Sequence, residues 1–81
     1  MTPERQAAEN IERLRGWHRM TQHDLAEPLG LRQSAIAKIE GGRRTLTLNE
    51  AHCIAVRFGV TLDQLCSPCL GLATYPSYWM H

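Results

Sequence analysis

Residues 20–42, with the sequence MTQHDLAEPLGLRQSAIAKIEGG, decide how this chain folds. The stretch holds two short segments, about 21–29 and 32–40, and only Gly30 and Leu31 lie between them. Apolar residues recur at intervals of three and four in both segments, which is typical of helices that bury one stripe. A two-residue connection with glycine at its corner makes two helices cross steeply. We therefore expect a helix-turn-helix arrangement here.

The rest of the chain carries equally clear helix boundaries. Thr2-Pro3 predicts a cap followed by proline at the first helical position. Three further starts have the capping-box pattern, in which a hydroxyl and an acid or amide satisfy free backbone N–H groups: Thr21 with Asp24, Thr47 with Glu50, and Thr61 with Gln64. Together with the glycines that follow, these marks predict helices at about 3–19, 21–29, 32–40, 47–58 and 61–66.

Each predicted helix has one apolar face, and no alternating run indicates a strand. The fold class is therefore all-α, a bundle of five helices. A chain of 81 residues is expected to form one domain, which we place at 1–66. Its core should consist of Ile11, Leu14, Trp17, Leu25, Ala26, Leu29, Ile36, Ile39, Leu48, Ala51, Ile54, Ala55, Phe58, Leu62 and Leu65.

The charge of the chain is concentrated in one short segment. The whole chain has a net charge of +1, but residues 32–47 alone carry +3, because they hold Arg32, Lys38, Arg43 and Arg44 against Glu40. A local basic surface can bind phosphates even when the chain as a whole is nearly neutral. Charge alone, however, is also compatible with an ordinary solvated face.

The outward face of the helix at 32–40 suits duplex DNA. With Ile36 and Ile39 turned inward, Gln33, Ser34, Ala37 and Lys38 face outward. Glutamine can pair with adenine, serine can donate or accept, lysine can reach guanine, and alanine can lie against a thymine methyl group. We therefore assign base reading to these four residues. Phosphate contacts are expected from residues at the ends of the two helices, namely Gln22, Arg32, Arg43 and Arg44.

The same positions carry a family resemblance. The residues Met20-Thr21-Gln22, Leu25-Ala26, Leu29-Gly30-Leu31, Gln33-Ser34, Ile36, Ile39-Glu40 and Gly42 form a pattern that resembles the lambda-repressor-like, Cro/CI-type helix-turn-helix family. With the later stretch from Leu48 to Leu65, the resemblance covers about residues 8–66. It implies a five-helix bundle that binds double-stranded operator DNA, usually as a homodimer on a pseudo-palindromic site. It also implies an ion pair between Arg15 and Glu40, phosphate binding by Gln22, and base reading by Gln33, Ser34 and Lys38.

Three residues depart from this pattern. Pro28 falls in the last turn of the second helix, where it removes a backbone hydrogen bond, so that helix should kink or end early. Arg32 stands where the family often has a capping serine or threonine, so the cap of the next helix should be weaker. Gly16 lies inside the first helix, at a cost of up to ~1 kcal/mol relative to alanine.

Residues 67–81 form a tail outside the resemblance. The tail has no charged side chain apart from His81, but it contains Tyr75, Tyr78 and Trp79, which are unusual in a disordered segment. It could fold back on its own bundle, cover a second subunit, or bind another protein. The last possibility gives an alternative function, a protein-binding module such as an antitoxin or anti-repressor.

The leading hypothesis is a transcriptional regulator, a repressor of the phage or plasmid type, and not an enzyme. No nucleophile–base pair, phosphate-binding loop or metal-ligand set stands out, and we expect no cofactor. Cys66 and Cys69 form a C-x-x-C pair that zinc or redox chemistry could use, with His52, Cys53 and His81 as candidate further ligands, but neither use is favoured. The odd count of three cysteines, and the lack of a secretion signal or membrane-spanning run, indicate a cytoplasmic protein.

Overall fold

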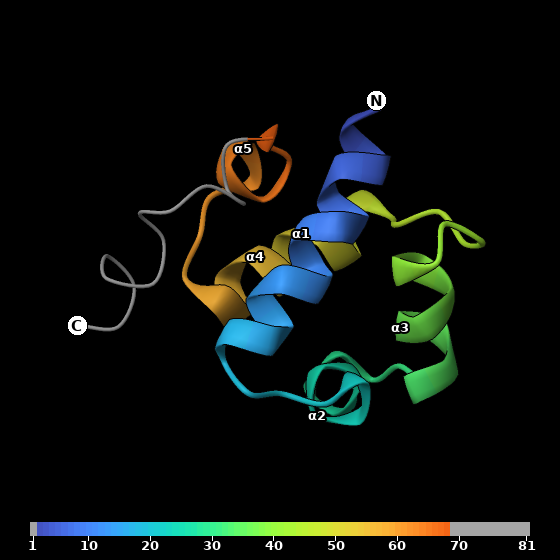
Figure 1. Ribbon diagram of the computed structural model, residues 1–81. Coiled ribbons are helices and arrows are strands. Elements are labelled where there is room, and N and C mark those ends of the chain that lie inside the picture. The colour runs from blue at the N-terminus through green and yellow to red at the C-terminus, as the bar shows by residue number, and fades with distance from the viewer. Residues whose placement is uncertain (1, 69–81) are drawn as a thin grey trace.

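The computed structural model of the chain describes residues 2–68, and these residues are helical throughout, apart from short connections. Figure 1 shows α1 running through the middle of the molecule, with α3 on one side, α5 on the other and α4 crossing behind it. The helices are α1 (Pro3–Trp17), α2 (Gln22–Ala26), the 3₁₀ turn η1 (Glu27–Leu29), α3 (Gln33–Glu40), α4 (Leu48–Phe58) and α5 (Leu62–Leu65). The predicted all-α class and the predicted number of α-helices are confirmed for this part of the chain.

The helix starts follow the capping residues. The Thr2 side chain accepts a hydrogen bond from the backbone N–H of Arg5 at the start of α1. All three predicted capping boxes form, so each threonine hydroxyl accepts from the backbone of the residue three positions on: Thr21 from Asp24, Thr47 from Glu50 and Thr61 from Gln64. The cap of α3 is the exception, because the side chain of Arg32 makes no capping hydrogen bond. The weaker cap expected there is confirmed.

Pro28 shortens the second helix, as its lack of an N–H group requires. The helix expected at 21–29 ends as an α-helix at Ala26 and continues as the 3₁₀ turn η1. Gly30 follows with a φ of 70°, a left-handed conformation that side chains other than glycine rarely adopt. The chain can therefore turn sharply into α3 at this point.

The core lies where α1, α2, α3 and α4 meet. Its fully buried large side chains are Ile11, Leu14, Leu25, Ile36, Ile39, Ile54 and Leu65. Ala26 is also completely buried among them, and its small side chain allows α2 and α3 to approach closely. One core prediction was wrong. Leu48 is 77% exposed because it is the first residue of α4, beyond the edge of the bundle, where it lines a shallow hollow with Asn49, His52 and Leu62.

A buried asparagine, which the apolar pattern did not reveal, joins the first and last helices. Asn10 of α1 has no exposed surface, and its Nδ2 donates to the backbone oxygens of Leu65 at 2.7 Å and Ser67 at 2.8 Å. Its Oδ1 accepts from Gln6 at 3.2 Å and from Arg13 at 3.3 Å. Since both amide atoms are satisfied, the polar group can be buried without a large penalty. Asn10 thus fixes the end of α5 against α1.

Two further predictions concern the tail of the chain and membrane-spanning helices. Residues 69–81, which hold the aromatic part of the tail, lie outside the described residues, so the three arrangements proposed for the tail stay predictions. Within residues 2–68, no helix combines the length and apolar character needed to cross a membrane.

Candidate nucleic-acid interface

The helix α3 presents a polar edge to solvent while its opposite side is held in the core. Ile36 and Ile39 are buried, whereas Gln33, Ser34 and Lys38 are exposed. Ala37 is half-buried at the border between the two faces. An α-helix with its side chains is about 10–12 Å in diameter, and the major groove of B-form DNA is about 12 Å wide. The dimensions of α3 therefore suit this groove.

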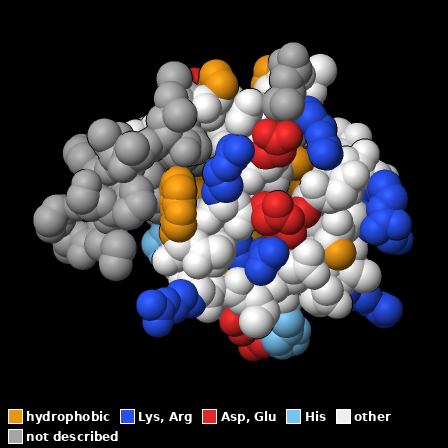
Figure 2. Space-filling model, in the orientation of Figure 1, with side chains coloured by type: hydrophobic (Ala, Val, Ile, Leu, Met, Phe, Trp, Pro, Cys, Tyr) orange, Lys and Arg blue, Asp and Glu red, His pale blue; other side chains and the backbone are white. Residues whose placement is uncertain are grey.

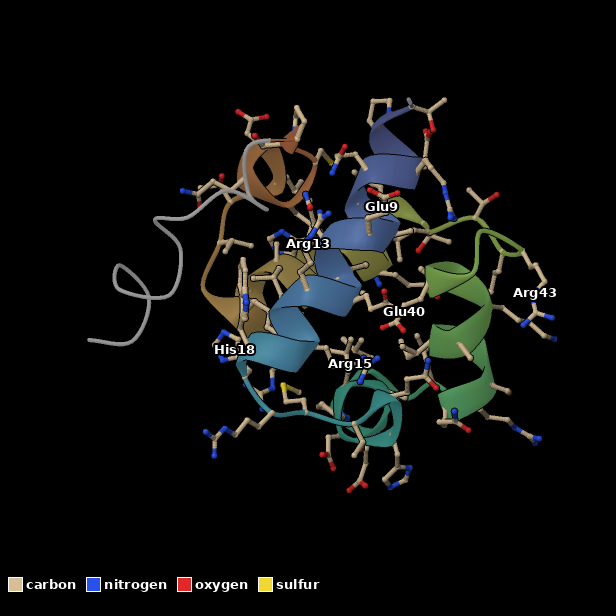
Figure 3. All side chains as sticks on the ribbon, viewed as in Figure 1. Glu9, Arg13, Arg15, His18, Glu40 and Arg43 are labelled. Carbon is tan, nitrogen blue, oxygen red and sulfur yellow. The ribbon has the colours of Figure 1, made fainter. Side chains whose placement is uncertain are left out.

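An ion pair ties the end of α3 to α1. Arg15 donates from Nε to Oε2 of Glu40 at 2.8 Å and from Nη2 to Oε1 at 3.2 Å, and its Nη1 donates to the backbone oxygen of Met20. The Glu40 side chain is only 3% exposed. Its hydrogen bond raises the pKa of Arg15, against the effect of burial. Figure 3 shows both side chains in the space between α1 and α3. The ion pair expected from the resemblance is thus present.

The same carboxylate is the inner end of a chain of hydrogen bonds that reaches the surface. Gln22, at the start of α2, donates from Nε2 to Oε1 of Glu40 at 3.0 Å. Its own Oε1 accepts from Nε2 of Gln33 at 2.5 Å. The structure therefore brings together two residues that the sequence analysis placed in different roles. Their contact was not anticipated, because the spacing of residues along the chain does not give the distance between two helices.

The predicted phosphate-binding arginines differ in their surroundings. Arg32 and Arg43 are exposed and make no ion pair within residues 2–68, and the same holds for Lys38, which was predicted to read bases. Figure 2 shows Lys and Arg side chains spread along the edge formed by α3 and the loop that follows it, and Figure 3 places Arg43 at the outer side of that loop. This edge is the most accessible basic part of the candidate interface.

Arg44 is instead engaged by a carboxylate. Its Nη1 and Nη2 donate to the two oxygens of Glu50 at 2.9 and 2.8 Å. The hydrogen bond from Arg44 is the main reason that the pKa of Glu50 is lowered to about 2, and the same bond raises the pKa of Arg44. Because its charge is already balanced, Arg44 is less available to phosphate than Arg43.

Hollows lie at both ends of α3. One, beside its start, is lined by Arg15, Arg19, Gln22, His23 and Gln33, among others. The other, a cleft of about 460 Å³ beside its end, is lined by Arg5, Gly42, Arg43 and Arg44 and by parts of α1. The Arg5 guanidinium passes directly over Gly42, where a Cβ would collide with Nη1. Arg5 makes no ion pair within residues 2–68, and the sequence analysis missed it because it lies far from α3 along the chain.

Within residues 2–68, the thiols and the potential metal ligands are not arranged as a site. Cys53 and Cys66 are free and half-buried, and burial raises the pKa of the Cys66 thiol, which disfavours a reactive thiolate. Cys69 and His81, the other residues considered for a metal or redox site, lie outside the described residues. Among residues 2–68, no three histidine, cysteine or acidic side chains gather closely enough to hold a metal ion.

Comparison with known proteins agrees with this geometry. A family profile described as "Helix-turn-helix" matches residues 11–65, which include all of α2, α3 and α4. The chain is also 37% identical over 59 residues to a protein named HTH-type transcriptional activator BcrR from Enterococcus faecalis. The matched part is 73% of this chain but only 29% of that relative. No solved structure matches the chain significantly.

Proposed function

Because the chain belongs to the helix-turn-helix family of DNA-binding transcription regulators, we propose that α3 is its recognition helix and reads base edges in the major groove. The observation that carries this proposal is the edge of α3, where Gln33, Ser34 and Lys38 are exposed on a helix whose other side is anchored by Ile36 and Ile39. Amide, hydroxyl and ammonium groups on a rigid helix are the groups that discriminate base pairs in this groove.

Each exposed group has a suitable partner on a base. Gln33 keeps its Oε1 and one N–H free after donating to Gln22, so it can accept from adenine N6 and donate to N7. Lys38 can donate to guanine, and Ser34 to either purine. Ala37 contributes a methyl group at the margin of the helix, suited to a thymine methyl.

Phosphate contacts at the two ends of α3 would set its orientation. Gln22 retains one N–H beside the free backbone N–H groups of the first turn of α2. Arg32 and Arg43 carry exposed charges, and Arg5 faces the same cleft as Arg43. Arg44 takes part more weakly because it must share its guanidinium with Glu50.

The complete binding unit in this proposal is a two-fold dimer on a pseudo-palindromic site. One α3 offers only four base-reading residues, whereas two copies placed about 34 Å apart would read successive major grooves and double the number of specified bases. Its regulatory effect would be repression, because covering promoter DNA needs nothing beyond this interface. The named relative is an activator, so a reporter gene under a promoter that contains the selected site decides the sign.

Selection of binding sites from random duplex DNA tests the proposal. The full chain should enrich one sequence with two half-sites in opposite orientation, and the complex with that sequence should contain two chains by analytical ultracentrifugation. Enrichment of a site without two-fold symmetry, bound by one chain, would contradict the dimer. Failure to enrich any sequence would contradict base reading altogether.

A further inference from the structure

We propose that Glu40 fixes the donor and acceptor direction of the hydrogen bonds that join it to Gln22 and Gln22 to Gln33. In this way Glu40 determines which base Gln33 recognises. The inference rests on the proposed function, because it concerns how the same helix α3 reads DNA. Glu40 itself contacts no base in this proposal, since its side chain is 3% exposed, and it acts as a positioning residue.

The direction follows from the chemistry of a carboxylate. A carboxylate has no N–H or O–H group, so it can only accept hydrogen bonds. Gln22 must therefore turn its NH₂ group toward Oε1 of Glu40, which leaves its carbonyl oxygen toward α3. That oxygen also only accepts, so Gln33 must donate to it. One acidic group at the inner end thus fixes both amides.

The outward pattern of Gln33 is the consequence. With one N–H engaged by Gln22, Gln33 presents one oxygen and one N–H to the groove. Adenine offers a matching donor at N6 and acceptor at N7, whereas guanine offers two acceptors at O6 and N7. If the amides were reversed, Gln33 would present both N–H groups outward, and these would suit guanine. The fixed direction therefore favours adenine.

The ion pair explains what the replacement Glu40→Gln should do. Arg15 donates to both oxygens, from Nε to Oε2 at 2.8 Å and from Nη2 to Oε1 at 3.2 Å, so a glutamine at position 40 keeps the shorter bond when its oxygen replaces Oε2 and its NH₂ faces Gln22. Gln22 would then accept from position 40, donate to Gln33, and leave both N–H groups of Gln33 free. The variant should lose its preference for adenine over guanine at one base pair in each half-site.

The experiment measures Kd for the selected duplex and for a duplex with guanine in place of that adenine, at the base pair where Gln33→Ala abolishes discrimination. The full-length wild-type chain should prefer adenine by about 10-fold or more. In Glu40→Gln the ratio should fall to within about threefold of unity. The matched control is Arg15→Gln, which breaks the ion pair but keeps the carboxylate, so it should weaken the fold and yet retain the adenine preference.

A second variant covers the case in which the ion-pair variants do not fold. Gln22→Ala removes the middle residue of the chain of hydrogen bonds and leaves Arg15 and Glu40 paired. Gln22 is half-buried, so its replacement should disturb the fold less than a change in the ion pair. It should weaken binding to all sequences through its phosphate contact and, in addition, lower the adenine-to-guanine ratio. An unchanged ratio in both Glu40→Gln and Gln22→Ala would overturn the inference while base reading by α3 stands. A wild-type chain without any sequence preference would instead overturn the proposed function, and this inference with it.

Discussion

Replacement of Asn10 by alanine tests how strongly its hydrogen bonds hold the end of α5 against α1. The side chain is fully buried and donates to two backbone oxygens, those of Leu65 and Ser67, at 2.7 and 2.8 Å. Removing a hydrogen bond from a buried polar group costs about 1–3 kcal/mol when nothing replaces the donor. Leu65 lies in the core and Ser67 is half-buried, so water can replace the donor more easily at Ser67. We therefore expect a total loss of about 3 kcal/mol in the free energy of unfolding.

That loss is large for a domain of this size, whose stability is commonly about 5–15 kcal/mol. It corresponds to a fall of about 15 °C in the melting temperature. Urea unfolding followed by circular dichroism gives the free energy, and amide hydrogen exchange of α5 reports whether the loss is local. The matched control is Asn49→Ala, which removes an exposed asparagine from α4 and should change stability by less than about 0.5 kcal/mol. A loss in Asn10→Ala as small as in the control would refute the reasoning.

Three further outcomes follow from the charged side chains. Arg43→Gln should lower the slope of log Kobs against log salt concentration for DNA binding by about 0.9, and Arg44→Gln by less, because Glu50 already balances Arg44; a larger effect of Arg44→Gln would contradict this order. The pKa of Glu50 is lowered to about 2 from its usual 4.5, so its contribution to stability is complete above pH 4.5 and is lost as the pH falls toward 2. Between pH 4.5 and pH 2, the free energy of unfolding should therefore fall by about 1 kcal/mol less in Glu50→Gln than in the wild type. The contact between His23 Nε2 and Glu27 Oε2 is 3.0 Å long, but both side chains are largely exposed, so Glu27→Gln should lower the free energy of unfolding, measured with urea, by less than about 0.5 kcal/mol.

The helices and their boundaries could be predicted because they depend on local chemistry. A threonine three residues before an acid or amide caps a helix whatever surrounds it, and all three such boxes form. Pro28 ends α2 for an equally local reason, since it has no N–H group to donate. Leu48 was wrongly placed in the core because periodicity gives the side of a helix but not how far the neighbouring helices extend along it.

The contacts within the site depend on distances between elements, which a pattern does not contain. Gln22 and Gln33 were both recognised from the sequence as candidate DNA-binding residues. The hydrogen bond between them, and the one from Gln22 to Glu40, were not predicted. The two arginines after α3 were treated alike, although one of them is bound by Glu50 from the first turn of α4. Asn10 went unnoticed because a single polar residue in an apolar stripe usually indicates the edge of the buried face, whereas here it meets two chain carbonyls.

The most direct measurement compares Gln33→Ala with Asn49→Ala on the selected duplex, on each of its single-base-pair variants, and on random duplex DNA of equal length. Gln33→Ala should lose about 10- to 100-fold in affinity for the selected duplex, lose its preference at one base pair per half-site, and bind random DNA almost as the wild type does. Asn49→Ala should match the wild type on every duplex. Equal loss of affinity by Gln33→Ala on selected and random DNA would contradict the claim that the exposed edge of α3 reads bases.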